Sequence, residues 1–298
     1  MRFRITFESV RDQVLPWDYQ YALQAAFYRC LQEADPGYAT FLHEDGYQAH
    51  HNRRYKFFVF SDLRPLRKRD QTDIGYVIRK RQRLYLYFSS PLEDRLLTLL
   101  VTGFFKKNNK LPIVIPEAAK AEFRIQRIEV LKPEDFSAGS TTAILLSPVV
   151  VSLLRPDGST EYLRALDPRV PEQLRKNLQY KYSTLHQRES TDLDITITVD
   201  REYVERKGGA ESPAVTVLRH FFDRQPDGTY QVIAIKGFRA PIHLEGSPEL
   251  IQVAYDCGLG EKNSAGFGCW APKGSVNQRV PGGQRSARRR SLSGKRSE

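Results

Sequence analysis

The residues best suited to chemistry in this 298-residue sequence form a glycine-rich stretch near its end, at residues 257–270. The segment GLGEKNSAGFG places two Gly-hydrophobic-Gly units around Lys262, Asn263 and Ser264, which supply a positive charge and hydrogen-bond donors. Glycine permits positive φ angles and lets backbone amides approach a phosphate closely. The stretch is therefore suited to phosphate binding, and its four flanking glycines are Gly258, Gly260, Gly266 and Gly268.

The same glycines also suit a purely structural role. A helix is expected just before them, so Gly258 can end that helix and a tight turn can lead into a last strand at 267–270. The two roles are compatible. The stretch lacks the GxxxxGK[ST] spacing of a P-loop, and it follows a helix rather than a strand, which excludes a Rossmann fingerprint.

The cysteines and histidines do not have the spacing of a metal site. Cys30, Cys257 and Cys269 are odd in number and form no CxxC pair, so neither a disulfide framework nor a zinc site is expected. The six histidines include no HxxxH or HExxH pattern, and the neighbours His50 and His51 are poor joint ligands. We expect any enzymatic activity to need no metal and no other cofactor.

The net charge of +11 is unevenly distributed. Residues 271–298 contain eight basic residues and one acidic residue, which leaves a net charge of only +4 for residues 1–270. This Gly/Ser/Arg-rich end cannot bury a core and is expected to be a disordered tail, although basic tails can also attract nucleic acid. No apolar run is long enough to span a membrane, and the amino terminus lacks a signal-peptide pattern, so a cytoplasmic protein is expected.

The first half of the sequence has the pattern strand, helix, strand, strand, helix, strand. Apolar residues at helical spacing follow Asp18, which can cap the first helix, and an Asp-Pro-Gly sequence is a strong stop signal near its end. Ser90 and Glu93 form a capping box with proline at the first position of the second helix. The expected elements are strands at 2–7, 55–61, 83–88 and 122–131 and helices at 19–31 and 90–105.

The second half is less regular but comparable. Its expected elements are a strand or hairpin arm at 141–154, a helix at 172–182, strands at 192–199, 214–222 and 230–239, and a helix from 248 to 257. We therefore predict an α+β fold of two tandem ferredoxin-like (RRM-like) βαββαβ domains. The predicted domains are residues 1–135 and 140–271, and the disordered basic C-terminal tail follows at 272–298.

With these features in place, the sequence resembles the CRISPR repeat-processing endoribonucleases, Cas six, of the RAMP superfamily. The resemblance runs from Met1 to about Trp270, and GLGEKNSAGFG is its most specific part. It also includes the opening MRFRITF strand, the helix at 19–31, the FLHE segment just after that helix, and LSPV at 146–149. Members of this family generally consist of two ferredoxin-like domains, in agreement with the predicted elements.

The resemblance implies a chemistry and a set of catalytic residues. Metal-free RNA cleavage uses the ribose 2′-hydroxyl as nucleophile, so the protein must move protons and stabilise charge on the phosphate. The family's active site draws on a tyrosine in the first helix, a histidine just after it and a nearby lysine. The matching residues here are Tyr28, His43 and Lys56.

Alternatives remain for each of these three positions. Tyr28 lies one residue off the apolar stripe of its helix and could simply cover the edge of that stripe. His50 and His51 compete with His43 for the proton-transfer role. Arg53 and Arg54 lie next to Lys56 and could supply the charge in its place.

The resemblance implies a metal-independent endoribonuclease that cleaves CRISPR precursor RNA within repeats and leaves a 2′,3′-cyclic phosphate. The alternative is a non-catalytic RAMP subunit that holds crRNA in an interference complex. Expected partners are CRISPR repeat RNA or crRNA, other Cas proteins of an interference complex, and a second copy in a homodimer, but no membrane. Besides the glycine-rich stretch and the two arginines, the basic clusters at 64–68, 79–83 and 124–127 are expected to contact RNA, or to be solvated faces.

Overall fold

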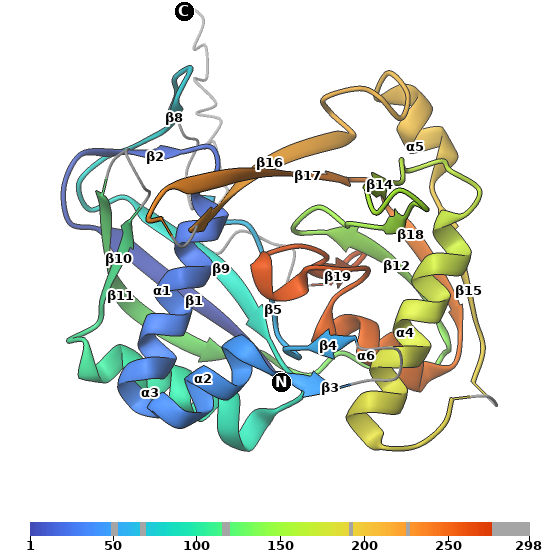
Figure 1. Cartoon of the computed structure of the whole chain (residues 1–298), viewed down its shortest axis with the longest axis horizontal. Helices are drawn as coiled ribbons and strands as arrows, with labels where there is room; N and C mark the ends of the chain where they lie inside the picture. Colours follow the sequence, from blue (N-terminus) through green and yellow to red (C-terminus); the bar gives the residue numbers. More distant parts are fainter. Residues whose placement is uncertain (49–52, 66–69, 115–119, 191–192, 225–226, 276–298) are drawn as a thin grey trace, which may run out of the picture.

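The computed structural model describes residues 1–48, 53–65, 70–114, 120–190, 193–224 and 227–275 of the chain. It shows an α+β protein whose N-terminal and C-terminal halves lie side by side, each with its own sheet and helices (Figure 1). His50, His51 and the predicted tail from residue 276 onward lie outside the described residues. Among the helices of the described ranges, none is long and apolar enough to cross a membrane.

The N-terminal half contains a six-stranded antiparallel sheet. Its neighbouring strands follow the order β10-β11-β1-β9-β5, and β6 also pairs with β9. In the centre, Ile5 lies opposite Ile128 on one side and Leu86 on the other. The strands are β1 (Arg2–Ser9), β5 (Val59–Phe60), β6 (Arg64–Pro65), β9 (Arg83–Ser89), β10 (Lys110–Val114) and β11 (Lys120–Val130).

Two helices cover one face of this sheet, α1 (Tyr19–Ala34) and α3 (Thr98–Lys106), and a π-helical turn η2 (Glu93–Leu97) precedes α3 (Figure 1). The predicted apolar stripe of α1 is buried, because β1 and β9 direct alternate apolar side chains toward it. The two helices pack closely: a Cβ added at Gly103 would lie 1.9 Å from the carbonyl oxygen of Cys30.

The C-terminal half contains a four-stranded antiparallel sheet in the order β15-β18-β12-β19. Helices α4 and α6 bury their apolar faces in the core of this half, and Ser247 caps α6 as its Ser-Pro-Glu sequence suggests, accepting the Leu250 N–H at 3.2 Å. The elements are β12 (Ser140–Leu145), α4 (Val170–His186), β15 (Ile195–Val199), α5 (Arg201–Arg206), β18 (Ile242–Gly246), α6 (Pro248–Cys257) and β19 (Trp270–Pro272).

Short hairpins and ribbons lie outside the two sheets. The longest, formed by β16 (Thr216–Arg224) and β17 (Tyr230–Phe238), crosses from the C-terminal half to the start of α1 (Figure 1). There Asp18 accepts hydrogen bonds from the backbone and the ring Nδ1 of His220 at 3.0 and 2.9 Å. The remaining strands are β2 (Gln13–Pro16), β3 (Tyr47–Gln48), β4 (Arg54–Tyr55), β7 (Asp70–Gln71), β8 (Gly75–Ile78), β13 (Ser152–Leu154) and β14 (Thr160–Tyr162).

Several sequence-based expectations about elements were wrong. The residues after α1 form a second helix, α2 (Pro36–Glu44), because Asp35 both ends α1 and caps α2 by accepting the Tyr38 N–H at 2.9 Å. Asp18 makes no side-chain cap on α1, since its carboxylate is bonded to His220.

The expected strands at 55–61 and 141–154 are each interrupted. Phe57 has a φ of 49°, which breaks the first into β4 and β5, and the second ends at Leu145 before resuming as β13. The pair expected at 214–222 and 230–239 forms the separate β16–β17 hairpin. Its place in the C-terminal sheet is taken by β18, which was not predicted.

Candidate active site

His43 lies in the last turn of α2, and not in a loop as its His-Glu-Asp-Gly context suggests. The helix ends because the amides of Asp45 and Gly46 both donate to the carbonyl of Phe41, at 3.0 and 2.7 Å, with Gly46 at a positive φ of 62°. The imidazole of His43 is exposed. This position leaves the ring free to meet a ligand while its backbone is held by helical hydrogen bonds.

Two cations from the segment around β4 cap the carboxyl end of α2. The ammonium of Lys56 donates to the carbonyl oxygens of Leu42 and His43, and Arg54 Nη1 donates to the carbonyl of Glu44 at 2.7 Å. Positive groups are favoured at a helix carboxyl end because they satisfy its free carbonyls and oppose its dipole. Lys56 therefore also fixes the turn that carries His43.

Tyr28 meets His43 from α1. The two rings are in edge-to-face contact with centroids 5.3 Å apart, and the other side of Tyr28 packs on Phe58 at 6.1 Å. Burial raises the pKa of the Tyr28 hydroxyl well above its ordinary value, so the phenol stays protonated and is able to donate a hydrogen bond to a ligand. The structure thus brings Tyr28, His43 and Lys56 together from three separate segments.

The glycine-rich loop, residues 258–268, is organised by a buried lysine that the sequence analysis missed. Lys181 of α4 is 1% exposed, and its ammonium donates to the carbonyls of Gly258 and Gly260 and to Asn263 Oδ1 at 2.7–2.8 Å. Burial lowers the pKa of Lys181 to about 8. A lysine three residues beyond Leu178 on the apolar face of α4 is a sequence signal for such a buried role.

The four loop glycines pack against the protein itself. A Cβ at Gly268 would lie 1.9 Å from the Leu259 carbonyl oxygen, and one at Gly266 would lie 2.6 Å from the Phe60 ring. All four glycines are buried, and three of their amides donate within the protein, namely those of Gly258, Gly266 and Gly268. The geometry supports the structural role of these glycines, and their approach to a phosphate stays a prediction.

Asn263 is likewise used inside the loop. Its Nδ2 donates to the carbonyls of Leu259 and Phe267 at 3.1 and 3.0 Å, and its Oδ1 accepts from Lys181. The prediction that Asn263 contacts RNA stays a prediction, since its side chain is half-buried like that of Ser264. Of the polar loop residues, Lys262 is exposed and Ser264 is half-buried, so both remain accessible to a ligand.

A cavity of about 470 Å3 lies between the two halves, beside this loop, and we call it the loop cavity. Its walls are the β4 segment, β13, α4 and the loop, and five of its lining residues are basic against the single acid Glu261. The basic residues are Arg53, Arg54, Lys56, Lys181 and Lys262. Because Lys56 also caps the helix of His43, the cavity opens next to the Tyr28–His43 pair.

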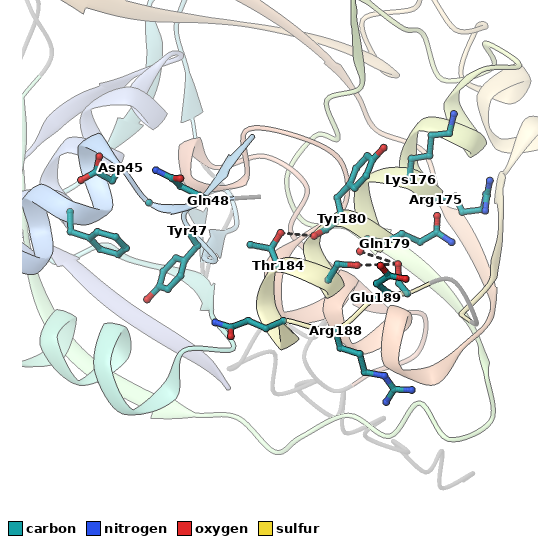
Figure 2. A pocket seen from close by; sticks show the side chains of 15 residues that line it. Asp45, Tyr47, Gln48, Arg175, Lys176, Gln179, Tyr180, Thr184, Arg188 and Glu189 are labelled. Atoms are coloured by element: carbon teal, nitrogen blue, oxygen red, sulfur yellow. Dashed lines mark hydrogen bonds between the residues drawn. The ribbon is translucent and has the colours of Figure 1, made fainter. Parts of the chain in front are cut away.

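A larger cleft of about 1220 Å3 lies on the other side of the β3–β4 hairpin. Figure 2 shows Asp45, Tyr47 and Gln48 on one wall, facing α4 on the other. Its charge is more balanced, since two acids line it with three bases, and two of those bases, Arg175 and Lys176, are paired with Glu172 at 2.9 and 3.3 Å. Between the two spaces, the Arg53 guanidinium lies over the Tyr180 ring at 5.0 Å. The loop cavity is therefore the better anion site.

The described residues of the other predicted basic clusters do not line the loop cavity, and residues 66–68 lie outside the described residues. Arg83 and Arg127 pair with neighbouring acids at 3.5 and 3.0 Å, and Arg79 lies 3.9 Å from Asp12. Within the described ranges, the side chains of His, Cys, Asp and Glu form no group of three or more that could hold a metal ion.

Comparison with protein families places similarity along nearly the whole described chain. Residues 14–126 match the family model described as CRISPR-associated protein Cas6, N-terminal. Residues 131–272 match the family model described as CRISPR associated protein Cas6, C-terminal. The first match ends at residue 126 and the second begins at residue 131, a few residues before the predicted end of the first domain at 135.

Individual proteins show the same similarity. The chain is 28% identical over 278 residues to the CRISPR-associated endoribonuclease Cas6 1 of Methanocaldococcus jannaschii, covering 90% of this chain and 91% of that protein. It is 25% identical over 274 residues to the CRISPR-associated endoribonuclease Cas6 of Pyrococcus furiosus, covering 90% and 88%. A solved structure titled CRISPR associated protein Cas6 superposes with a TM-score of 0.63 at 25% identity, covering 91% of this chain and 98% of that one.

Proposed function

The chain belongs to the Cas6 family of CRISPR-associated proteins, and on this premise we propose that it is a metal-independent endoribonuclease that cleaves CRISPR precursor RNA within repeats. The observation that carries the proposal is that exposed His43 meets the Tyr28 ring through its imidazole and the Lys56 ammonium through its carbonyl, beside a cavity lined by five basic residues. An imidazole can transfer the protons of metal-free RNA cleavage, and a protonated phenol and an ammonium can stabilise the charge on the phosphate.

The proposed reaction moves one proton at each stage. His43 accepts the proton of the ribose 2′-hydroxyl as its oxygen attacks the neighbouring phosphorus. The bond between phosphorus and the 5′-oxygen then breaks, the leaving oxygen takes a proton from the imidazolium, and a 2′,3′-cyclic phosphate and a 5′-hydroxyl result. Tyr28 donates a hydrogen bond to the phosphate, while Lys56 stabilises its additional negative charge.

The proposed architecture is two tandem ferredoxin-like domains, at 1–135 and 140–271. In the N-terminal sheet the neighbouring strands are β11, β1, β9 and β5. Counted along the chain, these are the fourth, first, third and second strands, and α1 and α3 are the crossover helices. The C-terminal sheet has the same order of fourth, first, third and second strand, in β19, β12, β18 and β15. Its crossover helices are α4 and α6. Both orders support the βαββαβ plan.

The proposed RNA contacts are the accessible residues beside His43. These are Arg53, Arg54, Lys262 and Ser264, which line the loop cavity and offer charge and hydrogen bonds to phosphates. Association with other Cas proteins and formation of a homodimer stay predictions.

A cleavage assay in EDTA tests the proposed function. A repeat RNA carrying a label at its 5′ end should be cut by the wild-type protein at one position within the repeat, because none of the proposed groups needs a metal. Loss of cleavage on addition of EDTA would contradict the metal-independent mechanism. Binding of the repeat without any product would instead favour a non-catalytic RAMP subunit that holds crRNA.

The ammonium of Lys56 makes cleavage sensitive to alkaline pH. Burial and, to a smaller extent, the nearby charge of Arg54 lower the pKa of Lys56 to about 8 from its ordinary value of 10.5. The side chain is charged below that pH and neutral above it, so the cleavage rate should fall as pH rises through 8, by roughly tenfold at pH 9.

The matched variant for this prediction is Lys56→Arg. Its guanidinium keeps its charge throughout this range, so cleavage by the variant should stay level between pH 7 and 9. The measurement is the single-turnover rate of both proteins across that range. The same decline in the wild type and in Lys56→Arg would show that Lys56 is not the titrating group.

A further inference from the structure

The loop cavity contains a buried polar group that neither the fold nor the proposed reaction uses. Asn177 of α4 is 6% exposed and lines the cavity one helical turn before Lys181. Its Oδ1 is buried and has no hydrogen-bond partner among the residues that the structure describes. A buried amide oxygen left unpaired costs stability, so its position in a cavity wall points to a ligand that supplies the missing donor.

The cavity also has the size and the wall chemistry for a nucleobase. Its volume of about 470 Å3 lies within the range of small-ligand sites. The half-buried ring of Tyr55 lines one wall and offers an aromatic surface to a base, and buried Phe57 stacks on that ring at a centroid distance of 5.5 Å. Cations lie around this wall and suit the phosphates on either side of a nucleotide.

Two residues of the cavity have unfavourable backbone conformations. Phe57 has a φ of 49° and Lys262 a φ of 56°, both in the left-handed region that residues with a side chain rarely adopt. One lies in the segment after β4 and the other in the glycine-rich loop, on the two sides of the cavity. Strained residues of this kind cluster at ligand sites, where the surrounding structure holds them in place.

We infer that the loop cavity takes the base of one unpaired RNA nucleotide adjacent to the scissile phosphate, with the Asn177 amide bonded to the edge of that base. The inference rests on the proposed function and extends it to a residue that sets sequence preference. Lys56 links the two sites, because it lines the cavity and also contacts the carbonyl of His43. An RNA chain with its scissile phosphate at His43 therefore has the base of the adjacent nucleotide within reach of the cavity.

Binding of non-cleavable repeat RNA tests the inference without relying on catalysis. The RNA carries a 2′-deoxy substitution at the cleaved nucleotide, and each nucleotide near that position is replaced in turn by an abasic one. For the wild type, one abasic position next to the cleavage site should weaken binding by roughly 5–150-fold, the range of a good hydrogen-bonded base contact. For Asn177→Leu, the same abasic substitution should have little further effect.

Two other variants distinguish base recognition from a structural effect. Asn177→Asp keeps the size of the side chain and leaves only acceptors, so the preferred base at the coupled position should change. Gln179→Ala is the matched control, since its amide lies on the same helix but lines the larger cleft and donates to the Leu193 carbonyl at 3.0 Å. This control should show the wild-type dependence on the abasic position.

The outcomes separate the inference from the proposed function. If the protein binds the repeat but no abasic position is coupled to residue 177, the base pocket is contradicted while the proposed endoribonuclease stands. If the protein binds no repeat RNA, both are overturned. The pocket is supported if one abasic position weakens binding by the wild type and by Gln179→Ala but has no further effect on Asn177→Leu.

Discussion

Replacing His43 with alanine should reduce the single-turnover cleavage rate by about 10²–10⁴-fold, the range for removal of a positioned acid or base. The imidazole is exposed and makes its aromatic contact with Tyr28, so its loss removes the proton acceptor and leaves α2 in place. Affinity for the repeat should change little, because Arg54 and Lys56 keep their contacts with backbone carbonyls. The measurements are single-turnover rate and equilibrium binding on the same RNA.

The chain provides a matched control for this variant in His186. This histidine also lies in the last turn of a helix and packs on a tyrosine, Tyr182, with a centroid distance of 4.5 Å. It does not line the loop cavity. His186→Ala should therefore cleave at the wild-type rate. Equal losses in the two variants would indicate that a general effect of removing histidine, and not proton transfer by His43, explains the result.

Replacing Asp62 with alanine should lower the free energy of unfolding by about 3–5 kcal/mol, the usual cost of breaking a buried ion pair. Asp62 lies after β5 and accepts from Arg219 of the β16–β17 hairpin and from Arg239 just beyond it. Arg219 is buried, with its side chain 4% exposed, and it also donates to the Gly266 carbonyl at 2.9 Å. Without Asp62, a buried guanidinium between the two halves and the glycine-rich loop loses its counter-charge.

Denaturant unfolding followed by circular dichroism checks this value. The control is Glu205→Ala, whose exposed carboxylate lies 3.8 Å from Arg201 within α5 and should contribute less than about 1 kcal/mol. Burial alone would raise the pKa of Asp62, but the two arginines hold it below its ordinary value. The stabilisation by Asp62 is thus present at neutral pH and is lost as pH falls through that lowered pKa. A similar loss of unfolding free energy in Asp62→Ala and in the control would contradict the assignment of this stability to the buried ion pair.

The fold could be predicted where periodicity is long and regular. The stripe of α1, the strands β1, β9 and β11, and the start of α6 at Ser247 follow from apolar spacing and capping alone. The prediction failed at short elements. Helix α2 was missed because Asp35 and Pro36 both stop one helix and start the next, and β18 was not predicted, although β15 of the same length was.

The candidate site was predictable as a set of residues but not as an arrangement. The family resemblance supplied Tyr28, His43 and Lys56, whereas the contact of Lys56 with the end of α2 depends on a fold that local sequence does not encode. The glycine-rich stretch was recognised from its spacing, yet its glycines pack inward around Lys181. Asn177 gave no sequence signal, because only the folded cavity shows that its amide lacks a partner.

The end groups of the RNA products test the central claim most directly. After cleavage of a repeat by the wild-type protein in EDTA, mass spectrometry of the upstream fragment should show a 2′,3′-cyclic phosphate, and the downstream fragment should carry a 5′-hydroxyl. Those ends follow from attack by the ribose 2′-hydroxyl with His43 as proton acceptor. A 3′-hydroxyl on the upstream fragment together with a 5′-phosphate on the downstream one would show that water, and not the ribose, is the nucleophile, and would contradict the account.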